Sequence, residues 1–85
     1  MAAPADAPPA AHPPVPIEVE LPITLGQFVK VAGFASTGGD AKRLVVRGLV
    51  LLNGHVEQRR GHRLSPGDVV EVAGAAARVS VSDQR

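Results

Sequence analysis

Hydrophobic residues recur at helical spacing just after position 24. They fall at i, i+3, i+4 and i+7, which places them on one face of a helix: Leu25, Phe28, Val29 and Ala32. Thr24 and Gln27 stand three residues apart, which is the spacing of a capping box. Gly33 suits the left-handed position that ends a helix. The pattern therefore predicts a short first helix over residues 25–32.

A second helix is predicted from Gly38 or Gly39 to Arg47, with Ser36 or Thr37 as its N-cap. Residues at i, i+3, i+4 and i+7 again share one face of this helix: Ala41, Leu44, Val45 and Gly48. Gly48 also ends the helix. At about 100° per residue, this apolar set lies between about 200° and 300° around the helix axis.

The basic residues of the second helix lie away from its apolar face. They fall at about 0°, 100° and 140° by the same count, and they are Lys42, Arg43 and Arg47. We therefore expect them on one side of the helix. Val46, at about 40°, is the one apolar residue that this geometry exposes among them.

After Gly48 the pattern changes to that of β-strands. Leu49–Leu52 and His55–Glu57 flank the dipeptide Asn53-Gly54. Both turn residues accept the positive φ of a type I′ turn, so this arrangement predicts a β-hairpin.

Three further segments complete the predicted sheet. Ser65–Asp68, with Pro and Gly at its centre, predicts a type II turn that leads into a strand at Val69–Val72. A last strand is expected through Val79 and Val81, and the alternation within residues 18–23 predicts another strand there. The sequence therefore indicates an α+β fold in which two short helices pack on a small, mostly antiparallel sheet.

The chain is long enough for one domain, which we place at residues 17–82. The sixteen residues before it are rich in Pro and Ala, and we expect a disordered tail there. Residues 83–85 form a short C-terminal tail. No segment is apolar for long enough to span a membrane.

Charge is unevenly distributed, although the net charge of the chain is only +1. Residues 1–20 contain three acidic residues and no Lys or Arg, whereas residues 38–63 contain six of the nine Lys and Arg residues. A cluster of this kind next to an apolar core suits a rigid basic surface for a polyanion.

The rest of the composition excludes several kinds of chemistry. The chain has no Cys, Trp or Tyr and only two Phe. It therefore lacks thiolate metal sites, thiol nucleophiles and the aromatic platforms on which single-stranded nucleic acids stack. The absence of cysteine fits a reducing compartment, and we expect a cytoplasmic protein.

The ordered set of segments resembles the ribosomal protein S-four-type RNA-binding domain, most closely the small stand-alone bacterial proteins of that family. The resemblance covers about residues 19–79 and rests on four segments: "LGQFVKVAG" (25–33), "STGGDAKRLVVRGLVLLNG" (36–54), "EQRRGHRL" (57–64) and "GDVVEV" (67–72). It implies the alpha-L RNA-binding motif, with RNA held against the second helix and the neighbouring loop of the sheet.

The resemblance also implies which residues contact RNA. They are Lys42, Arg43 and Arg47 on the second helix, and Arg59, Arg60, His62 and Arg63 after the hairpin. The family commonly has Lys or Arg at the position of His62, so the charge of that contact depends on pH. Lys30 matches a position that is often basic, and its role stays open.

Gly38 and Gly39 open the second helix and leave backbone N–H groups that suit a phosphate contact, although a tight turn between the helices explains them more simply. The spacing of a nucleotide-binding P-loop is absent. His55 and His62 lack a third ligand, so no metal or other cofactor is expected. No spacing suggests a catalytic triad.

We therefore expect a monomeric, non-catalytic protein that binds structured RNA, either ribosomal or transfer RNA, and no membrane or small-molecule substrate. A protein-interaction module whose basic face binds an acidic partner is the alternative. Binding to DNA is a third possibility, and it predicts equal affinity for duplex DNA and RNA.

Overall fold

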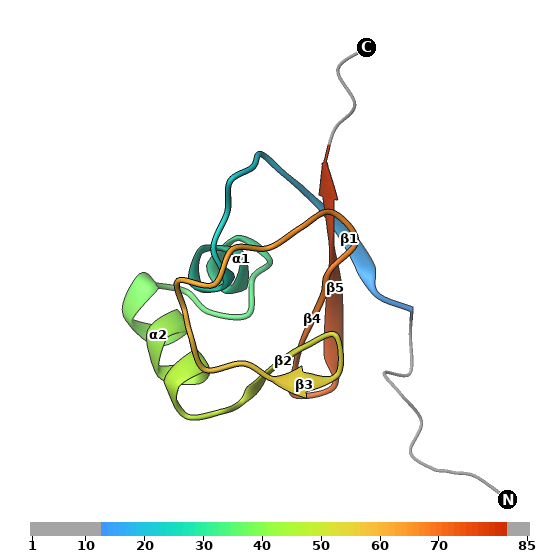
Figure 1. Cartoon of the computed structure of the whole chain (residues 1–85). Helices are drawn as coiled ribbons and strands as arrows, with labels where there is room; N and C mark the ends of the chain where they lie inside the picture. Colours follow the sequence, from blue (N-terminus) through green and yellow to red (C-terminus); the bar gives the residue numbers. More distant parts are fainter. Residues whose placement is uncertain (1–12, 82–85) are drawn as a thin grey trace, which may run out of the picture.

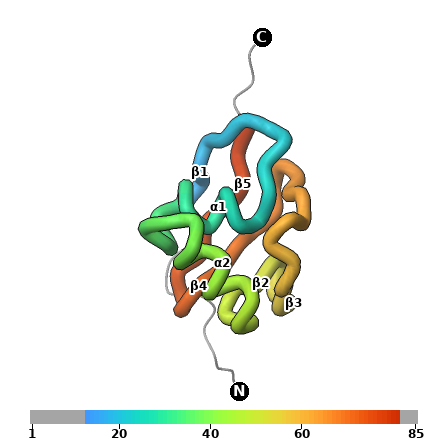
Figure 2. Tube along the Cα trace, turned by 90° about the vertical axis from the view of Figure 1, so that its left-hand side faces the viewer, coloured from blue at the N-terminus to red at the C-terminus, as the bar shows by residue number. Residues whose placement is uncertain are grey.

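Two helices lie against one side of a five-stranded sheet (Figure 1). Figure 2 shows the same layers after a quarter turn, with the helices facing the viewer. The computed structural model describes residues 13–81. The helices are α1 (Leu25–Val31) and α2 (Gly38–Val46), and the strands are β1 (Val15–Val19), β2 (Val50–Leu52), β3 (His55–Val56), β4 (Val69–Val72) and β5 (Ala75–Val81). The α+β architecture predicted from the sequence is confirmed.

The strands are ordered β1-β5-β4-β2-β3, and the sheet is mixed. β1 runs parallel to β5, while the other neighbours are antiparallel. The predicted hairpin is confirmed, because Asn53 and Gly54 have φ of 52° and 87° between β2 and β3, as a type I′ turn requires. The predicted strands after position 68 are also confirmed.

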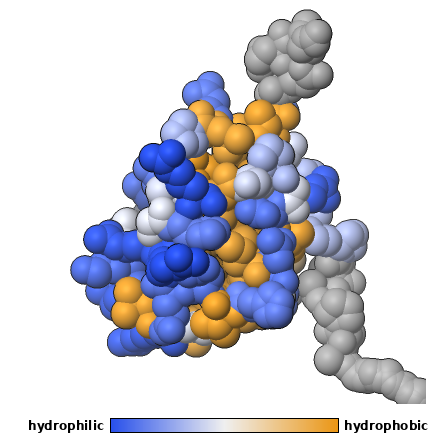
Figure 3. Space-filling view, in the orientation of Figure 1, coloured by the Kyte–Doolittle hydropathy of each residue, from blue (hydrophilic) through white to orange (hydrophobic). Residues whose placement is uncertain are grey.

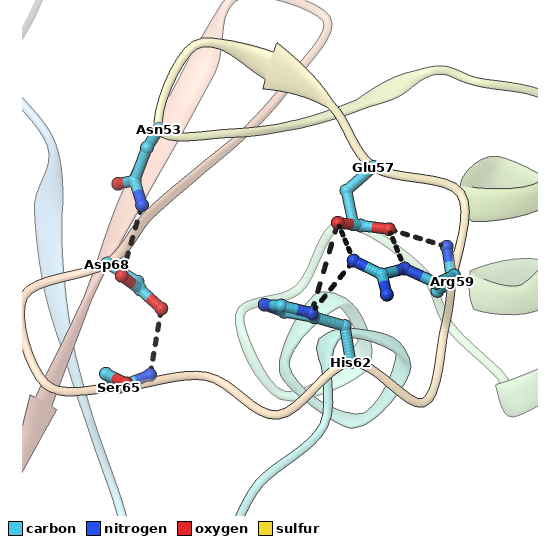
Figure 4. Close-up of polar contacts among 6 residues, drawn as sticks. All are labelled: Asn53, Glu57, Arg59, His62, Ser65 and Asp68. Carbon is cyan, nitrogen blue, oxygen red and sulfur yellow. Dashed lines mark hydrogen bonds and ion pairs between the residues drawn. The ribbon is translucent and has the colours of Figure 1, made fainter.

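Hydrogen bonds tie the hairpin turn to the turn that precedes β4 (Figure 4). The Asn53 side chain donates to Asp68 over 3.1 Å and accepts from the Val69 N–H over 2.9 Å. The other oxygen of Asp68 accepts from the Ser65 N–H over 2.8 Å. These contacts fix the relative position of the two turns at one end of the sheet.

Both helices begin at the residues that the sequence indicates. The Thr24 hydroxyl accepts from the Gln27 N–H over 3.3 Å, and the Gln27 side chain accepts from the Thr24 N–H over 2.9 Å, which completes the capping box. Thr37 caps α2 by accepting from the Asp40 N–H over 3.0 Å. Each helix ends one residue earlier than predicted, at Val31 and Val46.

The first strand is displaced from its prediction. The strand expected at residues 18–23 instead occupies Val15–Val19, where it pairs with Ala77–Val81 of β5. Val15 and Pro16, which we expected in the tail, therefore belong to the sheet. Proline is tolerated there because β1 lies at an edge of the sheet, where one side of the strand needs no N–H. Residues 1–12 of the predicted N-terminal tail and the whole predicted C-terminal tail, 83–85, lie outside the described residues.

The core lies between the helices and the sheet. Its fully buried large side chains are Leu25, Phe28 and Val29 of α1, Val45 of α2, and Val50, Val70 and Val79 of the sheet. Within residues 13–81 no polar or charged side chain is buried, so every charged side chain of this part of the protein is at least partly exposed to solvent. Val46 is 52% exposed, as its place on the helix predicts.

Candidate nucleic-acid interface

The loop of residues 57–63 is held against the first turn of α1 by backbone hydrogen bonds. The Leu25 N–H donates to the carbonyl oxygen of His62 over 2.8 Å, and the Gly26 N–H donates to that of Arg60 over 3.0 Å. The first N–H groups of a helix have no partner within the helix, so the loop carbonyls satisfy them. Arg60 is thereby placed beside α1.

Gly26 permits this close contact between the loop and the helix. A Cβ atom at position 26 would lie 3.3 Å from the Arg60 Cβ and 3.4 Å from the Arg60 carbonyl oxygen. The first separation is tighter than most Cβ contacts and the second is at the limit of ordinary van der Waals contact, so the loop would have to shift by a few tenths of an ångström. The side chain that is missing at Gly26 therefore helps to set the position of Arg60.

A hollow of about 500 Å³ lies where α1, the start of α2 and this loop meet. We call it the basic groove, and its lining consists of Thr24, Gly26, Gln27, Lys30, Gly38, Lys42, Arg60 and Gly61. Lys30 follows Gly26 by four residues and Lys42 follows Gly38 by four, so each lysine shares a helix face with a glycine. The groove thus combines cationic side chains with backbone at glycine positions, where no side chain covers it.

Three cations from three different elements line the basic groove, and no acidic residue does. Among residues 13–81 the Lys and Arg ion pairs join Arg43 to Asp40 and Arg59 to Glu57, and His62 Nδ1 lies 4.0 Å from the Glu57 carboxylate. Lys30, Lys42 and Arg60 take part in none of them. The lining therefore contains three cationic side chains and no carboxylate that would offset their charge.

Arg59 is largely occupied by Glu57 (Figure 4). Its side chain donates to the carboxylate from Nε over 2.9 Å and from a terminal nitrogen over 3.2 Å, and its backbone N–H donates over 3.0 Å. The hydrogen bond from the Arg59 side chain is the main reason that the pKa of Glu57 falls to about 2. The same contact raises the pKa of Arg59. At neutral pH the pair is therefore fully ionised.

Arg43 and Arg47 line a different hollow, of about 300 Å³. We call it the second hollow, and its lining consists of Phe34, Ala35, Ser36, Asp40, Arg43, Leu44, Arg47 and Leu49. Asp40, Arg43 and Arg47 are separated by three and four residues, so they form one face of α2. Lys42 lies about 100° or more away around the axis.

The structure thus divides the residues that the sequence proposed as one set. Lys42, Arg60 and Gly38 lie in the basic groove together with Lys30, whose role was open. Arg63 pairs with Thr24 in an isolated β-bridge beside the groove. Gly39 is absent from the lining of either hollow.

Sequence reasoning did not single out Gly26 or Gly61 as groove residues. Gly26 lies within the first helix, four residues before Lys30. Glycine within a helix lowers its stability by about 1 kcal/mol relative to alanine, so its presence there is the available sign of a close contact. Gly61 interrupts the basic segment "RRGHR", and a Cβ atom there would meet nothing within 4 Å.

Figure 3 shows strongly hydrophilic residues gathered over the helices and the adjoining loop, with exposed apolar residues beside them.

No group of three or more His, Cys, Asp or Glu residues within 13–81 is placed to hold a metal ion. The described part of the chain also contains no helix long and apolar enough to cross a membrane.

The chain belongs to the S4 domain family, whose model matches residues 15–80. It is 46% identical over 61 residues to the probable ribosome maturation protein RlbA of Bacillus subtilis (strain 168), a match that covers 72% of this chain and 84% of that protein. The family indicated by the sequence pattern is therefore confirmed.

Solved structures that share the fold include the following two. The solution structure of YbcJ from E. coli, described as an AlfaL motif involved in RNA binding, aligns with a TM-score of 0.57 at 22% identity over 94% of this chain and 98% of YbcJ. The 30S ribosomal protein S4e of Thermoplasma acidophilum aligns with a TM-score of 0.54 at 24% identity, over 72% of this chain and 30% of S4e.

Proposed function

We propose that this protein binds structured RNA by gripping its phosphate backbone in the basic groove, and that it catalyses no reaction. The observation that carries the proposal is the meeting of Lys30, Lys42 and Arg60 from three packed elements, with no acid in the lining. Cations on rigid elements bind phosphates at a lower ordering cost than cations on a mobile tail. The groove lining also lacks carboxylate and imidazole groups, which are the most common general acids and bases.

Recognition by shape and backbone suits the aromatic content of the chain. Phe28 is fully buried and Phe34 is half-buried, and the chain contains no Tyr or Trp. With one aromatic ring buried and the other half-buried, the protein offers little aromatic surface on which bases could stack in the manner of single-strand binders. Double-stranded RNA is recognised mostly through its phosphates and 2′-hydroxyl groups. The expected ligand is therefore a helical or junction element of RNA.

Relatives favour ribosomal RNA over transfer RNA as that ligand. One relative is named a probable ribosome maturation protein, and one structural neighbour is a ribosomal protein of the small subunit. We propose that the chain acts as a monomer in the cytoplasm on ribosomal RNA during ribosome maturation. Arg63, with Arg59 and His62 of the loop, extends the contact beyond the groove.

The Glu57–Arg59 pair limits how much Arg59 contributes to RNA binding. We expect Glu57→Gln to release Arg59 and add about one phosphate contact, which makes the slope of log affinity against log salt steeper by roughly 0.7–0.9. Because the pKa of Glu57 is depressed, its stabilising contribution is complete above about pH 4.5 and is lost as pH falls toward about 2. Thermal melting from pH 5 to pH 2 should therefore lose part of its pH dependence in this variant.

Glu18→Gln is the matched control for this variant. It removes the same charge from β1, at the opposite edge of the sheet from β3. We expect it to raise affinity only through net charge, without the steeper slope. Equal slopes for the two variants would contradict a specific restraint of Arg59 by Glu57.

The proposed function is tested by fluorescence anisotropy with a labelled ribosomal RNA hairpin and a DNA duplex of the same sequence. We expect tighter binding to RNA, with an affinity that falls steeply as salt increases. Equal affinity for the DNA duplex would show general polyanion binding instead. Absence of RNA binding at about 0.1 M salt, where the Debye length is about 10 Å, would refute the proposal.

A further inference from the structure

We infer that the second hollow docks an acidic segment of another protein, in which carboxylates flank a bulky apolar side chain. This site is separate from the RNA-binding groove and does not depend on the proposed function. The inference rests on the chemistry of the lining, which differs from that of the basic groove in two respects: its floor is apolar and its rim includes an acid.

The floor of the second hollow is apolar and accessible. Phe34 and Leu44 are half-buried against the core, and Leu49 is 52% exposed although it directly precedes β2. The Leu49 N–H donates to the Leu44 carbonyl oxygen over 3.1 Å, which holds these two side chains on the same side of the helix end. Covering such apolar surface releases about 25 cal/mol per Å². A hollow of about 300 Å³ has room for one large apolar side chain.

The rim of the hollow supplies charge complementarity to an acidic partner. Arg43 and Arg47 stand one helical turn apart, which suits two carboxylates on either side of an inserted apolar residue. Arg47 takes part in none of the ion pairs among residues 13–81, whereas Arg43 is held by Asp40. Arg47 is therefore the principal anchor, and Asp40 orients Arg43.

The same features disfavour RNA in this hollow. Asp40 pairs with Arg43 in the lining, which leaves Arg47 as the one lining cation outside the ion pairs of residues 13–81, whereas three such cations line the basic groove, so this hollow offers a polyanion less charge. Phosphates and riboses also gain little from the apolar floor formed by Leu44 and Leu49. A protein segment uses both the floor and the rim, so the two hollows on either side of α2 suit two different classes of macromolecule.

The test uses a short synthetic peptide with a central Leu-Phe pair flanked by Glu and Asp residues, titrated into the full-length 15N-labelled protein. We expect the largest amide shifts at residues 34–36, 40, 44, 47 and 49, and small shifts at Gly26, Gly38 and Gly61. Two control peptides replace the acids with Lys or the central pair with Ala. We expect each to bind at least about tenfold more weakly.

Variants separate docking from RNA binding. Arg47→Glu with Leu49→Ser changes two exposed positions, so the domain should stay folded, as its amide spectrum would confirm. We expect this variant to lose peptide affinity by at least about tenfold and to gain affinity for the Lys-flanked peptide. Lys42→Ala with Arg60→Ala should bind the acidic peptide with nearly wild-type affinity.

Three results would overturn the inference. The first is the absence of shifts around the second hollow at peptide concentrations on the order of 1 mM. The second is peptide affinity that Arg47→Glu and Leu49→Ser leave unchanged. The third is displacement of the peptide by an RNA hairpin that shifts the same amides, which would make the second hollow part of the RNA surface.

Discussion

Replacing Lys42 and Arg60 with Ala together is expected to weaken binding to a ribosomal RNA hairpin by about two orders of magnitude. Hydrogen bonds to charged groups are worth about 1.5–3 kcal/mol each, and the lower value applies to exposed side chains such as these. Two lost contacts therefore cost about 3 kcal/mol, which is about a hundredfold in affinity. The measurement is fluorescence anisotropy at constant salt. Thermal melting should change little, because both residues lie at the surface.

The pair Arg43→Ala and Arg47→Ala is the matched control. It also removes two positive charges, but from α2 and its C-cap on the side of the second hollow. We expect a loss of less than about tenfold, since screened charges act weakly over distances beyond about 10 Å. Equal losses from the two double variants would show that net charge, rather than the groove, governs RNA binding.

Phe28→Ala is expected to have the largest effect on stability. Phe28 is fully buried, and removing a buried aromatic ring costs about 3–5 kcal/mol. A domain of this size is stable by only about 0.05–0.15 kcal/mol per residue, so the variant loses much of its free energy of unfolding. Thermal melting monitored by circular dichroism should shift downward by more than about 10 °C. RNA binding should fall in parallel, because α1 carries both Gly26 and Lys30.

Val31→Ala provides the comparison on the same helix. Val31 is 57% exposed, so its truncation should change stability by less than about 1 kcal/mol. Equal melting temperatures for Phe28→Ala and Val31→Ala would contradict the burial of Phe28 between α1 and the sheet.

Most of the fold is local enough to be predicted from the sequence. Thr24 and Thr37 cap their own helices through contacts three residues away, and Asn53-Gly54 forms its turn through backbone conformation alone. The position of β1 is not local. It depends on parallel pairing with β5 about 60 residues later, and no short-range signal identifies that partner. The alternation of residues 18–23 therefore led to a strand placed too late.

The sequence proposed the residue types of the candidate site but not their arrangement. The helical period places Lys42, Arg43 and Arg47 away from the core, yet it does not show which neighbours each one meets. The neighbours of these residues depend on the loop at Arg60, which is held against α1 by hydrogen bonds from the N–H groups of Leu25 and Gly26. Backbone contacts of this kind leave almost no trace in the pattern of side chains.

The most direct test of the basic groove uses its own glycines. Gly26, Gly38 and Gly61 line the groove, whereas Gly54, Gly67 and Gly74 lie outside it at turns of the sheet. The measurement is a titration of the 15N-labelled protein with the RNA hairpin at about 0.1 M salt, followed through the glycine amide signals. We expect the three groove glycines to shift most and the three turn glycines to shift little. Large shifts confined to Gly54, Gly67 and Gly74 would place the RNA elsewhere and contradict the account.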